Sequence, residues 1–208
     1  LFMEEQEALD CIERLSNSDR NEGDEALQRL QTIWNKYLEC PTLLDASLER
    51  MVTLLAEPTR ELLNNMHEST ADPLTAVHRY LSSIYCLCKV RGRKYIQRFL
   101  PHTVQDVQVV YNGLRTCILQ QQTCWESAYI LFLWMATLSL VPFECRVLAS
   151  PDMLSKLYSI CRDHLTDPGP VREAAAICLA SWLSRPDGDL SEFGQWMQNL
   201  LGSVCSQQ

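Results

Sequence analysis

The chain has 208 residues, 47% of them hydrophobic, and a formal net charge of −8 at pH 7. This length suits one large domain or a run of about five two-helix repeats, and the acidic balance argues against a general nucleic-acid binder. The first residues are acidic and do not resemble a secretory signal, and the longest apolar run, 128–141, is too short to span a membrane.

The first half of the chain has a helical period almost throughout. One clear apolar stripe consists of Leu27, Leu30, Trp34 and Tyr37. Asp24 is a candidate N-cap for this helix, and Pro41 stops it. Asp45 opens the next helix, which Pro58 either kinks or divides, because proline is tolerated without loss only in a first turn. Asp72-Pro73 is a further helix start.

The second half continues in the same way. Gly92 interrupts the helix that starts at Pro73, and a short helix is expected at 94–100. Residues 125–140 are apolar nearly all round and predict the most buried helix, with Trp125 and Trp134 in the core. A last apolar stripe, expected to form a partly exposed patch, consists of Leu190, Phe193, Trp196, Met197 and Leu200.

Residues 167–183 have the pattern of the inner helix of a HEAT or armadillo repeat. A turn with Asp167 leads into a helix in which Ala175 and Ala176 allow close approach of a neighbouring helix. Arg172 is expected to pair with an acid in a turn and to fix the stacking. We therefore predict an all-α protein, an α-α superhelix of degenerate HEAT/armadillo-type repeats. An ordinary globular helical bundle is the alternative.

The ten cysteines and four histidines do not form a metal-binding pattern. No two cysteines have the Cys-x-x-Cys spacing, and Cys86 and Cys88 would point to different faces of a helix. We expect no metal site, no disulfide framework and no bound cofactor. Cysteines scattered among leucines and alanines are typical of small core residues in a reducing compartment.

No motif of catalysis is recognisable. The nucleophile elbow, the zinc-protease motif and the glycine-rich phosphate loop are all missing from the sequence. Glu4, Glu5 and Glu7 fit a solvated helix face, and His78 fits a half-exposed helix position. We predict that the chain is not an enzyme. An active site assembled only in three dimensions is the alternative.

One segment is strongly basic within this acidic chain. Residues 71–146 have 8 basic and 4 acidic residues, and a short run within them contains Lys89, Arg91, Arg93, Lys94 and Arg98. On a continuous helix Arg91, Lys94 and Arg98 would share one exposed face. This basic run is either a solvated face or a binding surface for an acidic partner, and it contains our candidate partner-binding residues.

Four blocks of sequence, in order, carry a resemblance to a known family. They are residues 36–45, the basic run followed by 99–102, residues 125–144, and residues 172–187. Together they resemble the N-terminal region of the tubulin-folding cofactor D family, also called tubulin-specific chaperone D. The chain starts without a methionine, so we expect it to be a fragment of something longer. Together with the resemblance, this predicts that 1–208 is a single helical-repeat domain, the N-terminal fragment of a larger solenoid protein.

The resemblance implies a cytoplasmic, cytoskeleton-associated chaperone. Members of this family capture β-tubulin and act with companion tubulin-folding cofactors and a small Arf-like GTPase to assemble or dismantle the αβ-tubulin heterodimer. With their partners they promote GTP hydrolysis by tubulin, so the nucleotide site belongs to tubulin. The alternative is a generic HEAT-repeat adaptor of another cytosolic assembly.

Overall fold

A computed structural model describes residues 2–17, 19–66, 73–119, 125–188, 191 and 193–198. Within these ranges the regular structure is helical and contains no strand. The elements in chain order are α1 (Glu5–Arg14), α2 (Arg20–Asn35), η1 (Pro41–Leu44), α3 (Asp45–Asn65), α4 (Pro73–Arg91), α5 (Arg93–Gln97), α6 (Val104–Leu119), α7 (Trp125–Leu138), α8 (Cys145–Leu148), α9 (Pro151–Asp163), η2 (His164–Thr166) and α10 (Pro170–Leu183).

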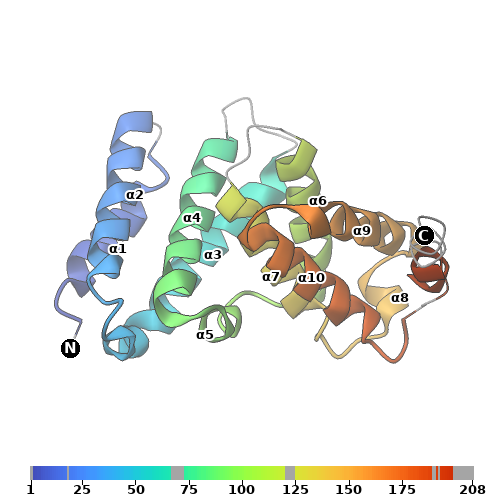
Figure 1. Ribbon diagram of the computed structural model, residues 1–208. Helices are drawn as coiled ribbons and strands as arrows, with labels where there is room; N and C mark the ends of the chain where they lie inside the picture. The colour runs from blue at the N-terminus through green and yellow to red at the C-terminus, as the bar shows by residue number, and fades with distance from the viewer. Residues whose placement is uncertain are drawn as a thin grey trace.

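The long helices form consecutive antiparallel pairs, α1/α2, α3/α4, α6/α7 and α9/α10. The second helices contact one another in the order α2, α4, α7, α10, and the first helices α1, α3 and α6 form a second row. Figure 1 shows α1 and α2 at one end of the stack and α9 and α10 at the other. The predicted helical-repeat architecture is therefore confirmed, and the closed globular bundle is excluded.

The second helices all end on one side of the stack, where the chain turns into the next pair (Figure 1). We call this side the turn edge and define it by residues 36–44, 92–103, 139–150 and 184–188. Both short helices α5 and α8 belong to it; α5 lies at the lower edge of Figure 1, and α8 lies at the right, beside α10.

Several helix boundaries differ from the predicted ones. The N-cap of α2 is Asp19, whose side chain accepts a hydrogen bond from Asn21 N, so Asp24 lies inside the helix instead of capping it. Pro58 lies inside a continuous α3 and does not divide it. Gly92 interrupts the helix as predicted, since its φ of 95° is not a helical value. Few residues other than glycine adopt this conformation.

The core runs through every pair, and three tryptophans, Trp34, Trp134 and Trp182, are fully buried within it. Helix α7 is buried on nearly all sides, as its sequence predicts. The prediction for Trp125 was wrong, because its side chain is 44% exposed. Trp125 is the first residue of α7, and it packs edge-on against Tyr85 with ring centroids 4.7 Å apart.

Helix α10 shows how the alanine pattern works. Ala174 and Ala175 are fully buried, whereas Ala176 is exposed, so the predicted close approach holds for Ala175 but not for Ala176. Trp182 lies two turns further along and donates a hydrogen bond from Nε1 to Met135 O of α7 at 3.0 Å. Small residues at one end of α10 and an indole at the other bind this helix to α7.

The structural role predicted for Arg172 was wrong. Its neighbour Val171 faces the core, which turns Arg172 to solvent, and Arg172 forms no ion pair within the described ranges. Other arginines connect the helical pairs instead. Arg79 of α4 binds the link between α1 and α2, and Arg185 binds the turn after α7.

The predicted C-terminal stripe is described only in part, since Leu190 and Leu200 lie outside the described residues. Phe193 packs against the core, and Trp196 is half-buried. Met197 is 38% exposed.

Candidate functional site

The candidate site is the turn edge. The last carbonyl groups of an α-helix have no partner within the helix and carry a partial negative charge, so cations are favoured beside them. The basic run lies where α4 ends, and Arg185 follows the end of α10. Two parts of this edge have distinct chemistry, namely the basic run and the turn between α7 and α8.

The structure divides the basic run between two helices. Arg91 is the last residue of α4, and Lys94 lies on α5, so the expected single helical face through Arg91, Lys94 and Arg98 does not exist. The break at Gly92 is the reason.

Arg91 has a structural role and does not lie on the exposed face that the sequence analysis predicted for it. Its side chain is 12% exposed and donates to both carboxylate oxygens of Asp45, at 2.5 and 2.8 Å. Its guanidinium also lies 3.6 Å from the Tyr95 ring centroid. The hydrogen bond from Arg91 lowers the pKa of Asp45. Because Arg91 is the last residue of α4 and Asp45 the first of α3, this pair joins the end of α4 to the start of α3.

The remaining cations of the run differ in their availability. Arg93 forms an ion pair with Glu173 of α10 at 3.3 Å. Lys89, Lys94 and Arg98 are exposed and form no ion pair within the described ranges. These three are therefore the cations of the run that an acidic partner could reach.

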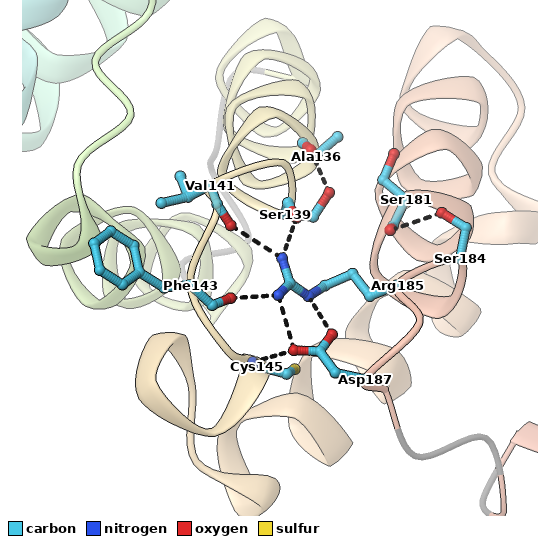
Figure 2. Close-up of polar contacts among 9 residues, drawn as sticks. All are labelled: Ala136, Ser139, Val141, Phe143, Cys145, Ser181, Ser184, Arg185 and Asp187. Carbon is cyan, nitrogen blue, oxygen red and sulfur yellow. Dashed lines mark hydrogen bonds and ion pairs between the residues drawn. The ribbon is translucent and has the colours of Figure 1, made fainter.

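The turn between α7 and α8 is organised by Arg185, a residue that the sequence analysis did not single out. Figure 2 shows its guanidinium pointing into this turn. Nη1 donates to Ser139 O at 2.5 Å and to Val141 O at 3.3 Å, and Nη2 donates to Phe143 O at 2.5 Å. One side chain that is only 11% exposed thus binds three carbonyl groups in the turn that follows α7.

Asp187 completes this arrangement. It accepts from Nε and Nη2 of Arg185, both at 3.0 Å, and from Cys145 N at 2.6 Å (Figure 2). The hydrogen bonds from Arg185 and Cys145 hold the pKa of this carboxyl below its usual range. The pair therefore stabilises the fold above the usual titration range of aspartate, and the contribution is lost as the pH falls below it. In the sequence, this arrangement could have been recognised from the Arg185-Pro186-Asp187 turn directly after an alanine-rich helix.

The fixed turn presents apolar side chains to solvent. Leu140 is 77% exposed, Phe143 is 51% exposed, and Val147 on α8 is 61% exposed. A shallow hollow lies beside them, between the turn and the end of α10. Its lining consists of Ser139, Leu140, Val141, Pro142, Phe143, Glu144, Ser181, Ser184, Arg185, Pro186 and Asp187.

Comparison with known proteins agrees with this architecture. A family model described as tubulin-specific chaperone D-like, ARM repeat, matches residues 34–204. The chain belongs to this family. Tubulin-folding cofactor D of Schizosaccharomyces pombe (strain 972 / ATCC 24843) is 28% identical over 205 residues, which is 89% of this chain and 18% of the relative. The chain thus spans less than a fifth of the length of that relative. No solved structure matches it.

The other chemistry in this chaperone D-like chain is that of a packed core. Burial raises the pKa of the Cys88 and Cys117 thiols to about 12, so both remain neutral. Within the described ranges no group of three or more metal-ligating side chains comes together, and no helix there has both the length and the apolar character needed to cross a bilayer. His78 is half-exposed as predicted, with Nδ1 2.8 Å from Ser127 Oγ.

Replacing Arg185 with alanine is expected to lower the free energy of unfolding by about 2 kcal/mol, since three carbonyl groups and Asp187 lose a charged donor. Urea unfolding followed by circular dichroism measures this loss. Arg172→Ala is the matched control, an exposed arginine on α10, and we expect it to change the midpoint little. Equal midpoints for the two variants would contradict the role of Arg185.

Proposed function

We propose that the chain is part of a tubulin-folding chaperone that helps to capture β-tubulin and to assemble or dismantle the αβ-tubulin heterodimer. The observation that carries this proposal is the match of residues 34–204 to the chaperone D-like family, together with the relative named tubulin-folding cofactor D. Stacked helical pairs support it, because such repeats offer extended surfaces for binding other proteins. Companion tubulin-folding cofactors and a small Arf-like GTPase are the further proposed partners.

The proposed role is that of a cytoplasmic, cytoskeleton-associated scaffold. Any GTP hydrolysis during the cycle would take place on tubulin, and the complete chaperone would stimulate it together with its partner cofactors. The work of this chain would then be to bind and orient folded partners.

The test is tubulin capture by the tagged full-length gene product, purified from cells alongside a tagged armadillo protein of unrelated function. We expect β-tubulin to be enriched with the first protein and not with the second, by quantitative immunoblot. Absence of enrichment in low-salt buffer would refute the proposal. Recovery of a stable complex without tubulin would favour the alternative, a HEAT-repeat adaptor of another assembly.

Within this function, we infer that the exposed cations of the basic run contact an acidic partner such as tubulin. Lys89, Lys94 and Arg98 support this role, since they are exposed and without an ion pair in the described structure. Arg91 and Arg93 contribute mainly to the fold, through Asp45 and Glu173. Charge at the rim of an interface mainly speeds association and sets orientation.

The double variant Lys94→Glu/Arg98→Glu is expected to bind tubulin about tenfold more weakly at low salt, with a difference that shrinks as salt screens the charges. Arg115→Glu/Lys156→Glu is the matched control, because it makes the same change in net charge at exposed positions on α6 and α9. Binding can be followed by interferometry at several salt concentrations. Wild-type affinity of the double variant at low salt would identify the run as a solvated face.

A further inference from the structure

We propose that Glu173 of α10 is an internal competitor of the acidic partner of this chain. In the free protein its carboxylate occupies Arg93, a cation of the basic run, and a carboxylate of the partner takes its place on binding. The contact between Glu173 and Arg93 is therefore autoinhibitory. The proposal rests on the proposed function, because it concerns the same basic run and takes tubulin as the first probe.

The ion pair connects two parts of the stack that do not follow one another directly. Arg93 is the first residue of α5, which comes after the second helical pair, and Glu173 lies on α10 of the fourth pair. Arg93 Nη2 lies 3.3 Å from Glu173 Oε1. Burial raises the pKa of Tyr129 of α7 to about 12, and the charges of Glu173 and Arg93 also act on this hydroxyl. The ion pair therefore passes beside α7, a helix that contacts both α5 and α10.

Arg93 can exchange its partner more easily than Arg91 can. Arg91 is 12% exposed and donates to both carboxylate oxygens of Asp45, at 2.5 and 2.8 Å. The contact of Arg93 with Glu173 is longer, and the two side chains are 28% and 62% exposed. An exposed ion pair of this kind contributes little to stability, because water solvates both charges. A carboxylate from another protein can therefore replace Glu173 at small cost.

Glu173 remains compensated when Arg93 leaves it. It lies in the first turn of α10, where the helix dipole favours a negative charge, and most of its side chain is in contact with water. The free and the displaced states of this carboxylate thus differ little in energy, as a competitor that can be displaced requires.

The charges around Arg93 determine the class of partner. Its occupant in the free protein is itself a carboxylate. Lys89 and Lys94 come shortly before and directly after it in the chain, are exposed, and form no ion pair in the part of the chain that the structure describes. Arg98 is left out of this group, because it lines a separate hollow together with two glutamates of α3. An acidic segment that displaces Glu173 would therefore gain a third cation beside the two lysines.

The first experiment compares variants of the full-length gene product in binding purified αβ-tubulin at low salt. Glu173→Gln frees Arg93 and should bind about threefold more tightly than the wild type. Glu13→Gln is the matched control, since it makes the same change in net charge at an exposed position of α1, at the other end of the stack. It should bind within about 1.5-fold of the wild type, because distant exposed charges are screened. Both variants should melt like the wild type.

Two further variants show whether Glu173 acts through Arg93. Arg93→Gln should bind tubulin about threefold more weakly than the wild type. Adding Glu173→Gln to it should then change the affinity by less than about 1.5-fold. An equal gain from Glu173→Gln in both backgrounds would overturn the proposal, because Glu173 would then only repel the partner from a distance. Wild-type affinity of Arg93→Gln, or no gain from Glu173→Gln alone, would overturn it as well.

Failure of the wild type to bind tubulin would refute the proposed function, and a second probe then decides the role of the ion pair. This probe is a fluorescein-labelled oligoglutamate peptide, titrated at low salt and followed by fluorescence anisotropy. Glu173→Gln should again bind about threefold more tightly than the wild type, and Glu13→Gln should not. Equal affinities of the two variants for the peptide, or no binding of the peptide by Glu173→Gln, would contradict an autoinhibitory role of Glu173.

Discussion

Replacing Arg79 with alanine is expected to lower the free energy of unfolding by about 3 kcal/mol, one of the two largest effects anticipated for this chain. Its side chain is only 5% exposed. Nη2 donates to Arg20 O at 2.8 Å, and Nη1 donates to Leu15 O and Asn17 O at 3.3 and 3.2 Å. Nε donates to Asp24 Oδ1 at 2.8 Å. The alanine variant would leave these carbonyl groups without a donor, and it would open a gap between α2 and α4.

Urea unfolding measures the loss, and two further variants show where it arises. Asp24→Asn should cost little, because this carboxylate is half exposed. Gly23→Ala should destabilise the wild type, because a Cβ there would lie 2.2 Å from Arg79 Nη1. The same change should cost much less when Arg79 is already alanine. An unchanged midpoint for Arg79→Ala would show that the guanidinium is not needed to join the first two pairs.

Replacing Trp182 with alanine is expected to cost about 3–5 kcal/mol, the range for a fully buried tryptophan. The indole is inaccessible to solvent, and its Nε1 donates to Met135 O at 3.0 Å. Since each repeat is stabilised mainly by its neighbour, the damage should be concentrated in α9 and α10. Hydrogen exchange should show early loss of protection there and retained protection in α3 and α4.

Two milder changes serve as controls for this variant. Trp182→Phe keeps most of the buried ring and loses the hydrogen bond, so it should cost clearly less than the alanine variant. Ala180→Ser changes an exposed position of the same helix and should be nearly neutral. A uniform loss of protection across all pairs would contradict the repeat-wise picture of stability.

The helices were largely predictable because their signals are local. The stripe that ends at Trp34 and Tyr37 defines the buried side of α2, and the long apolar run from 128 identifies α7 as the central helix. Failures occurred where a local signal has two meanings. Asp24 and Asp19 are equally good N-cap residues by type, and only the start of the helix at Arg20 decides between them.

The candidate site was predictable only in part. The basic run was visible in the sequence, but its division into structural and available cations was not. Arg91 pairs with Asp45, which lies 46 positions earlier, and no spacing rule connects them. The turn after α7 was less visible still, because its exposed Leu140 and Phe143 look like the end of a buried apolar run.

The sequence by itself determined the helical class, the pairing of successive helices and the family, because apolar periodicity, short turns and residue order are properties of neighbouring positions. The tertiary structure alone decided which arginines join the repeats. Arg172 was the expected one, yet one residue of helical rotation turns it to solvent, while Arg79 and Arg185 reach carbonyl groups of other pairs. The physical reason is that a hydrogen bond to a distant backbone atom depends on where the stacked helices end in space, and helix ends meet only after the pairs have packed.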